Sequence, residues 1–255
     1  MGSIQWKNVK RNFIIQNNLI LIPARGGSTR VKDKNIRLLG GKPLVQHTIE
    51  SALKSISGRV VVSTNSAEIA SIARSCGAEV PFTRPAELAS STASSLSVIY
   101  HVLDWFKNNE NWIPEFVLLC PPTNPFRTSE TIKEMLKKLK QCPDINSIVT
   151  VTVPATHPFS IVREQQNGKF GDGVISIDGK TINDLERKQE WPKVWEGSPA
   201  CRITRTDYFV KTRKSGKIRT YDSNNFIGYE ISKREALDID TEDDLFLAEF
   251  QCSTR

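Results

Sequence analysis

The fold is decided by residues 19–43, LILIPARGGSTRVKDKNIRLLGGKP, in which an apolar run enters a basic loop that contains glycine. Leu19 to Pro23 predicts a buried strand, because its apolar residues are continuous. Gly26 and Gly27 follow at the carboxyl end of that strand, where open α/β sheets place their ligands. Glycine lets the backbone approach phosphate oxygens closely. The stretch therefore predicts an α/β protein with an anion site after its first strand.

Positive charge is concentrated in the same loop, where five cations fall within thirteen residues: Arg25, Arg30, Lys32, Lys34 and Arg37. These cations repel one another unless a polyanion neutralises them, so phosphate groups are the expected partner. The usual phosphate motifs are absent, since Gly41-Lys42 is followed by Pro43 and no G-x-G-x-x-G follows a strand. A P-loop ATPase or a dinucleotide enzyme is therefore disfavoured. The alternative is a glycine turn with a solvated basic face.

The rest of the chain alternates apolar runs with amphipathic stretches, which is typical of strands and crossover helices. Further strands are expected at 59–63, 79–82, 116–120, 147–153 and 226–231, and helices at 43–56, 67–76, 90–106 and from 128 and 241. Residues 154–219 lack periodicity and predict a lid, an inserted hairpin or an oligomer contact. We expect one α/β domain over 19–255, after a basic extension at 1–18.

Composition narrows the class of protein. The chain has 255 residues, and 35 basic against 28 acidic side chains give a net charge of +7, which favours anionic ligands or simply a solvated surface. The five cysteines are far apart and form no C-x-x-C pair, so we expect reduced thiols in a cytoplasmic protein. No stretch approaches the roughly 20 apolar residues that span a bilayer, and the apolar run near the N-terminus is too short for a signal sequence. Neither secretion nor membrane association is expected.

An acidic motif, LDIDTEDD, occupies residues 237–244. If residues 236–240 form a strand, Asp238 and Asp240 point to the same face. Two adjacent carboxylates are costly unless a cation lies between them, and Mg²⁺ prefers such oxygen ligands. We therefore expect these two aspartates to bind metal. Thr241 and Asp244 instead have the spacing of a helix capping box.

A third candidate segment is RPAELASSTASS, residues 84–95. Its small residues could lie against a base and present hydroxyl groups, while Arg84 could reach a phosphate or ribose; a capped helix after a turn is the alternative. No Ser-His-Asp or Cys-His nucleophile set is evident. His47 and His101 fall within expected helices and are interpreted as packing or surface residues. His157 could contact a substrate or simply belong to a loop.

Together these segments resemble the acylneuraminate cytidylyltransferases, also called CMP-sialic acid synthetases, and their relatives that activate legionaminic and pseudaminic acids. The match runs from Leu19 to Gln251 in four ordered pieces: IPARGGSTRVKDKN with LGGKPLVQHTI, RPAELASSTASS, PPTNPFRT and LDIDT. The resemblance implies a mostly parallel nucleotide-binding sheet flanked by helices, a small dimerisation element at about 155–200, and a homodimer. It implies a reaction of CTP with an acidic nine-carbon 3-deoxy-2-keto sugar, with Mg²⁺ as cofactor and pyrophosphate as product.

The resemblance also implies roles for individual residues. Catalysis would depend on Arg25, Lys34 and Asp240. The nucleotide would be bound by Ala24, Arg25, Gly26, Gly27, Ser28, Arg30, Lys34, Asn35, Arg84, Ala93 and Ser95. The sugar would be bound by Pro121, Thr123, Arg127 and Arg202. The metal pair would be Asp238 and Asp240.

Three positions depart from the family pattern. Thr29 replaces a usual lysine of the basic loop, Pro121 replaces the glutamine of LLQPTSPLRT, and Arg202 stands where an aromatic residue is common. The last two lie on the sugar side, so the identity of the sugar stays open. The alternatives are another sugar nucleotidyltransferase, such as one for 3-deoxy-octulosonate, or a non-catalytic nucleotide- or RNA-binding homologue. Nucleic-acid binding is not expected, because no aromatic stacking platform is evident.

Overall fold

The computed structural model describes residues 17–253 except positions 29, 175 and 217. Its centre is a six-stranded sheet in the order β10-β6-β9-β5-β1-β4. The strands are β1 (Asn18–Pro23), β4 (Arg59–Ser63), β5 (Phe116–Leu119), β6 (Ser147–Thr152), β9 (Glu196–Arg205) and β10 (Phe226–Glu230). All pairs are parallel except those of β9, which runs antiparallel to both β5 and β6. The predicted mostly parallel α/β class is confirmed.

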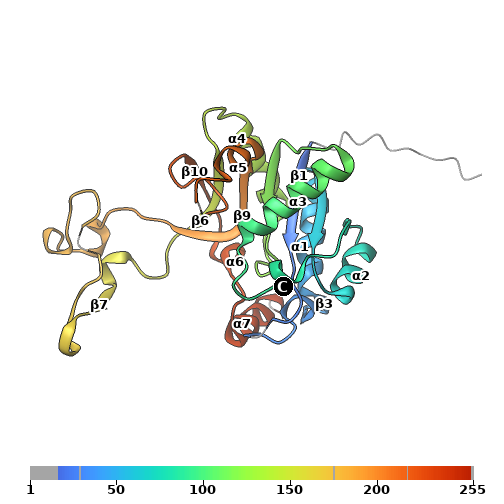
Figure 1. Ribbon diagram of the computed structural model, residues 1–255. Helices are drawn as coiled ribbons and strands as arrows, with labels where there is room; N and C mark the ends of the chain where they lie inside the picture. Colours follow the sequence, from blue (N-terminus) through green and yellow to red (C-terminus); the bar gives the residue numbers. More distant parts are fainter. Residues whose placement is uncertain (1–16, 29, 175, 217, 254–255) are drawn as a thin grey trace, which may run out of the picture.

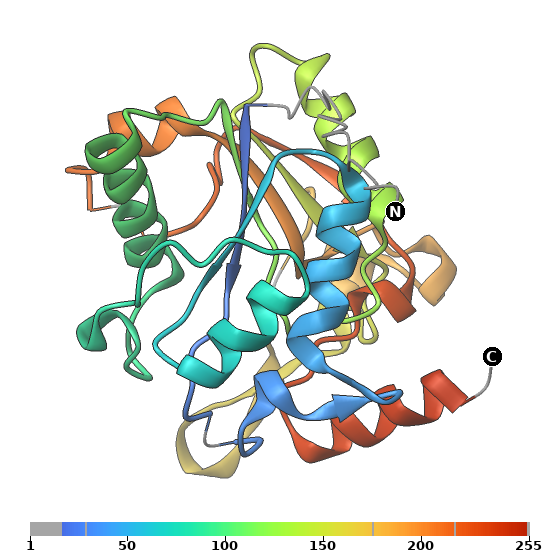
Figure 2. The same cartoon turned by 90° about the vertical axis from the view of Figure 1, so that its right-hand side faces the viewer.

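Helices cover both faces of this sheet (Figure 2). Ile20 and Ile22 of β1 pack with side chains of α1 (Leu44–Ser55), α2 (Ala67–Ser75) and α4 (Ser129–Lys140). Leu19 and Leu21 face the opposite way, toward α3 (Ser95–Glu110) and α5 (Thr206–Thr212). Because successive residues of a strand point to opposite faces, a strand buried on both faces must be continuously apolar.

The remaining elements lie at the edges of this core. Two helices follow β10, namely α6 (Lys233–Ala236) and α7 (Glu242–Ser253). Short antiparallel pairs are formed by β2 (Leu38–Leu39) with β3 (Lys42–Pro43), and by β7 (Val162–Glu164) with β8 (Phe170–Asp172). Single 3₁₀ turns occur at Lys34–Ile36, Ala86–Leu88, Pro158–Ser160, Gln166–Gly168, Ile182–Asp184 and Lys188–Glu190. In the part of the chain that the structure describes, no helix is long and apolar enough to cross a membrane.

Residues 153–195, which we call the projecting segment, extend away from the sheet (Figure 1). Among the described residues of the segment, Phe159 is the one buried apolar side chain. Its ring packs with those of His157 and Trp191, and His157 Nε2 lies 2.9 Å from the Pro192 carbonyl oxygen. His157 is therefore a structural residue of the segment.

Three expectations about secondary structure are wrong. Residues 79–82 form no strand, because only Glu79 bridges to Val61. Residues 236–240 form no strand, because the Ile239 N–H donates to the Thr123 carbonyl in a loop rather than to a neighbouring strand. Residues 154–219 are not irregular throughout, since they contain β9 and α5.

The missed strand β9 has the sequence EGSPACRITR, in which glycine, proline and arginine obscure the strand signal. Proline fits here because the register between β6 and β9 shifts between Val149 and Val151, and such irregularities accommodate a residue without an N–H. The expected basic extension at 1–18 lies outside the described residues, except for Asn17 and for Asn18, which begins β1.

Candidate functional site

A cavity of ≈ 340 Å³ lies beyond the carboxyl ends of β1 and β5, which are neighbouring parallel strands. Ten residues predicted for the site line it: Arg25, Ser28, Arg30, Lys34, Asn35, Arg84, Ala93, Ser95, Pro121 and Thr123. Other lining residues were not assigned a role from the sequence: Pro23, Val31, Leu88, Ser90, Ser91, Val98 and Pro122. Ser90 and Ser91 belong to the hydroxyl-rich segment RPAELASSTASS, so the composition of that segment could have identified them as lining residues. The cavity and residues 237–240 beside it form what we call the strand-end site.

The basic loop after β1 is held in shape from several sides. Asn35 is buried, and its Nδ2 donates to the Arg25 carbonyl at 2.7 Å. The Gly26 N–H donates to Asn65 Oδ1 at 2.9 Å. Gly27 has a φ of 69°, a left-handed conformation that glycine adopts without strain. The loop therefore presents its cations from a fixed backbone, which suits a phosphate cradle.

Arg84 brings a buried positive charge to the lining of the cavity. It is 4% exposed, its Nε donates to Ser63 Oγ at 3.0 Å, and its Nη2 donates to the Ser63 carbonyl. Burial, together with the nearby charge of Arg25, lowers the pKa of Arg84 to about 10. Among the described residues Arg84 has no ion pair with a carboxylate, so an anion that enters the cavity would be its counter-charge.

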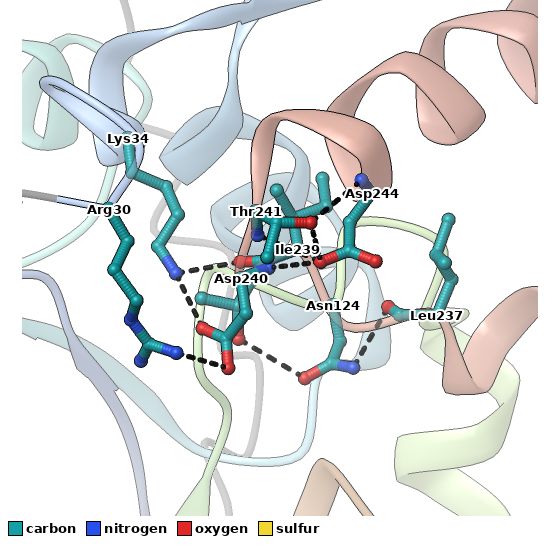
Figure 3. Close-up of polar contacts among 9 residues, drawn as sticks. Arg30, Lys34, Asn124, Leu237, Ile239, Asp240, Thr241 and Asp244 are labelled. Carbon is teal, nitrogen blue, oxygen red and sulfur yellow. Dashed lines mark hydrogen bonds and ion pairs between the residues drawn. The ribbon is translucent and has the colours of Figure 1, made fainter.

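The acidic motif contacts the basic loop, although the two lie far apart in the sequence. Lys34 Nζ donates to the Ile239 carbonyl at 2.7 Å and to Asp240 Oδ1 at 3.0 Å, a separation of 205 and 206 residues. Arg30 Nη1 lies 3.4 Å from Asp240 Oδ2 (Figure 3). Asp240 therefore neutralises two cations that also line the cavity.

Asp238 lies deeper than Asp240. Its Oδ1 is buried without a hydrogen-bond partner among the described residues. Burial raises the pKa of Asp238; a hydrogen bond from the Thr123 side chain to this carboxyl opposes the shift, and the neighbouring charge of Asp240 adds to it. Across the residues described, no group of three or more His, Cys, Asp or Glu side chains could hold a metal ion by itself. A cation at this pair would need further ligands from a bound molecule or water.

Asp244 has a structural role in the same motif. Its Oδ2 accepts hydrogen bonds from the Asp240 N–H at 3.0 Å, the Thr241 N–H at 2.8 Å and Thr241 Oγ1 at 2.8 Å. The Asp244 N–H in turn donates to Thr241 Oγ1 at 3.2 Å, which completes a reciprocal cap at the start of α7. The predicted capping box is confirmed.

Several residues predicted for the site do not line the cavity. Ala24, Gly26 and Gly27 form the backbone of the loop, and Thr29 lies outside the described residues.

Arg127 and Arg202 also lie outside the cavity lining. Arg127 is 2% exposed, and its Nη1 donates to the carbonyls of Pro121 and Ala200. Arg202 donates to Thr220 Oγ1 at 3.2 Å. Burial lowers the pKa of Arg202, and the charge of Asp238 opposes that shift. The sugar-binding roles of these two arginines remain predictions.

Comparisons with known proteins match the sequence to a family. The family model described as Cytidylyltransferase matches residues 19–170, more than half of the chain. The CMP-N,N'-diacetyllegionaminic acid synthase of Legionella pneumophila is 39% identical over 144 residues, which are 56% of this chain and 59% of that protein. The N-acylneuraminate cytidylyltransferase of Streptococcus agalactiae serotype V is 29% identical over 89% of this chain and 51% of that protein. The chain therefore spans little more than half the length of these curated relatives.

A solved structure shares the fold. CMP:2-keto-3-deoxy-manno-octonic acid synthetase in complex with CTP superimposes with a TM-score of 0.67 at 16% sequence identity, covering 93% of this chain and 98% of that one. At that identity the likeness establishes the architecture alone.

Proposed function

Because the chain belongs to the cytidylyltransferase family, we propose that it transfers the CMP group of CTP to a 3-deoxy-2-keto nonulosonic, sialic-acid-like sugar acid and releases pyrophosphate. The observation that carries this proposal is the strand-end site itself. One cavity combines four cations, Arg25, Arg30, Lys34 and Arg84, with hydroxyl groups of the segment before α3. A carboxylate pair, Asp238 and Asp240, lies beside two of these cations, Arg30 and Lys34.

The triphosphate is assigned to the basic loop. Arg25 and Lys34 provide charge on the cavity wall, and Arg30 joins them when a phosphate displaces Asp240. Asn35 fixes the Arg25 backbone, and Arg84 supplies a buried charge beside the CMP portion. Ala93 and Ser95 stand at the start of α3, where a small residue and a hydroxyl leave room for a flat base. This arrangement favours a nucleotide over a small inorganic anion.

We further propose that Asp238 and Asp240 hold Mg²⁺ together with the phosphates of CTP. The buried, unpartnered Oδ1 of Asp238 and the raised pKa of this carboxyl fit a group that needs a cation. When bound, a divalent ion of this kind neutralises charge that develops on phosphate oxygens. Asp240 would exchange Lys34 and Arg30 for the ion, which frees both side chains for the triphosphate.

In the proposed reaction the anomeric hydroxyl oxygen of the sugar acid attacks the α-phosphorus of CTP. The bond between the α-phosphorus and the α–β bridging oxygen breaks, pyrophosphate leaves with the bonding electrons, and the hydroxyl proton passes to a base. The protein holds two anionic reactants in line and compensates their charges with Arg25, Lys34 and Arg84. Asp240 or solvent is the candidate proton acceptor.

The acidic sugar is assigned to the Pro121 side of the cavity. Pro121 and Thr123 line it, and the half-buried Arg202 lies close enough to influence Asp238 electrostatically. The names of the relatives, a legionaminic acid synthase and an N-acylneuraminate cytidylyltransferase, support a nine-carbon acid as the acceptor class.

We also propose that the protein is a homodimer and that the projecting segment supplies the contact. Ile161, Val162 and Phe170 of this segment are 49%, 59% and 66% exposed, and apolar side chains gathered on one protrusion favour burial against a second chain. A cytoplasmic location is proposed with it, since all five cysteines are free thiols.

The test is pyrophosphate release from each of the four nucleoside triphosphates, with legionaminic acid, pseudaminic acid, N-acetylneuraminic acid and 3-deoxy-octulosonate as acceptors. We expect release only with CTP, and only with a nine-carbon acid. Release that is fastest with 3-deoxy-octulosonate would shift the assignment to the eight-carbon class. No release with CTP and any of these acids would reject the proposal.

A further inference from the structure

The acidic segment of the strand-end site is attached to the loop after β5 at two points. The Nδ2 of Asn124 donates to the Leu237 carbonyl at 3.0 Å and to the Ala236 carbonyl at 3.4 Å. The Ile239 N–H donates to the Thr123 carbonyl at 2.9 Å. Asp238 lies between Leu237 and Ile239 in the sequence, so the loop after β5 holds the residue on each side of this carboxylate. Figure 3 shows the contact of Asn124 with Leu237.

Asn124 is suited to this role by its burial. The residue is 0% exposed, and its Oδ1 accepts a hydrogen bond of 3.4 Å from Thr123 Oγ1, which orients the amide. A buried carbonyl group that loses its hydrogen-bond donor cannot bind water instead, so loss of the Asn124 amide would be costly. Residues 237–240 belong to no strand, and these bonds replace the ladder that would otherwise fix their backbone.

The opposite side of the segment is bound by the basic loop. Lys34 Nζ donates to the Ile239 carbonyl, while the Ile239 N–H donates to the Thr123 carbonyl, so one residue joins the loops after β1 and β5. The placement of both carboxylates therefore depends on two loops that also line the nucleotide cavity.

We propose that Asn124 is a positioning residue that fixes the Asp238–Asp240 segment in the geometry needed to bind a divalent cation with CTP. The inference rests on the proposed function, since it assigns those carboxylates to a cation. Groups that orient metal ligands without touching the metal typically change metal affinity by about 10- to 100-fold when removed. The contribution of Asn124 should be of that size and should be specific to the cation.

The experiment compares Asn124→Ala and Asn124→Ser with a matched control, Asn18→Ala. Asn18 is also 0% exposed and its Nδ2 also donates to a backbone carbonyl, that of Ser57 at 2.6 Å, but it lies at the opposite end of β1. Three quantities are measured for each variant: Mn²⁺ binding in the presence of CTP by electron paramagnetic resonance, CTP affinity in EDTA by calorimetry, and the Mg²⁺ concentration for half-maximal pyrophosphate release.

We expect the Asn124 variants to weaken Mn²⁺ binding and raise the Mg²⁺ requirement by about tenfold or more, while CTP affinity in EDTA is unchanged. Asn18→Ala should lower the melting temperature and leave all three quantities alone. Mn²⁺ binding that is equal in folded Asn124 variants and wild type would overturn the proposal, as would an equal loss in Asn18→Ala. The serine variant keeps the test decisive if the alanine variant does not fold. If wild type binds Mn²⁺ with CTP but releases no pyrophosphate, the proposed function fails while the Mn²⁺ comparison still decides the role of Asn124.

Discussion

The strand-end site and the projecting segment hold their side chains by opposite means. At the strand-end site, Asn35, Arg84 and Asn124 are buried and are fixed by hydrogen bonds to backbone carbonyls. In the projecting segment, Ile161, Val162 and Phe170 are exposed, and the internal contacts are the β7–β8 pair and a small aromatic cluster. Both regions follow strands of the same sheet.

This contrast between buried polar and exposed apolar side chains indicates a different function for each region. Buried polar groups are specified to a single arrangement, because leaving one unpaired is expensive, so the site is preorganised for charged ligands. An apolar surface that the chain itself does not cover gains most by burial against another surface. We therefore expect mutations at the site to change chemistry, and mutations in the projecting segment to change assembly.

The largest expected effect is at Asp240. Asp240→Asn should lower kcat by about a thousandfold or more, because it removes a ligand worth several kcal/mol of charge stabilisation. CTP affinity in EDTA should not fall, since Lys34 and Arg30 are released from their ion pairs. Pyrophosphate release and calorimetry measure the two quantities. Glu242→Gln is the control, because Glu242 belongs to the same motif and pairs with Arg37 at 3.5 Å. Equal turnover of Asp240→Asn and this control would contradict the proposed metal role of Asp240.

Lys34→Ala should reduce kcat/KM by about a hundredfold, the size expected when one preorganised donor to a charged transition state is lost. The lysine also ties Ile239 and Asp240 to the basic loop, so Mg²⁺ dependence should change as well. The matched control is Lys42→Ala, since Lys42 follows in the same stretch but pairs with Glu50 at 2.8 Å. Similar kinetics for the two variants would remove the triphosphate assignment.

Trp191→Ala tests the other region. Its ring packs against His157 and Phe159, so its loss should disorganise the proposed dimer contact and weaken association by about 2 kcal/mol. Light scattering coupled to size-exclusion chromatography should show the wild type as a dimer and the variant shifted toward monomer, with unchanged CTP affinity. Val210→Ser, at a residue that is 67% exposed on α5, should not alter the dimer. A monomeric wild type would contradict the assigned role of the projecting segment.

The smallest expected effect concerns an ion pair outside both regions, between Arg213 and Asp104 on α3. The hydrogen bond from Arg213 lowers the pKa of Asp104 below its usual value near 4. Its stabilisation is therefore present above the pKa of the unfolded state and is lost as pH falls through the folded value. Both side chains are more than a third exposed, so screening limits the contribution to less than about 1 kcal/mol.

Urea unfolding of Arg213→Ala and wild type at pH 7 and pH 3 measures this contribution. The difference in free energy of unfolding should be small at pH 7 and smaller at pH 3. A difference in the free energy of unfolding that grows as pH falls would contradict the assigned pKa shift. A difference as large as the several kcal/mol expected at Asp240 would contradict the view that this is an ordinary surface ion pair.

The sequence allowed prediction of those parts of the site whose residue types are demanding. Gly27 must adopt a positive φ, and a cluster of cations needs an anion, so the loop after β1 could be recognised locally. Leu88 and Val98 also line the cavity, and their place there was not predicted. Helix α3 begins at Ser95 rather than at residue 90, because the side chain of Ser94 caps it. The contact of Lys34 with Asp240 joins residues 206 apart, and no local spacing predicts it.

The fold was predictable where strands are continuously apolar, as in β1 and β5, and less so where tertiary contacts replace local preference. Residues 79–82 have an apolar pattern but contribute a single bridge at Glu79. Strand β9 carries Pro199 and Arg202 yet is held between β5 and β6 on both sides. In each case pairing with a distant strand, rather than the segment's own composition, decides the outcome.

The most direct measurement is the mass of the product formed from CTP, Mg²⁺ and a nonulosonic acid by the wild-type protein, with Asp240→Asn alongside. The account predicts a species whose mass is that of CMP joined to the sugar acid with loss of one water, formed together with pyrophosphate and absent from the Asp240→Asn sample. Unchanged CTP with every nonulosonic acid tested, or equal product from both proteins, would contradict it.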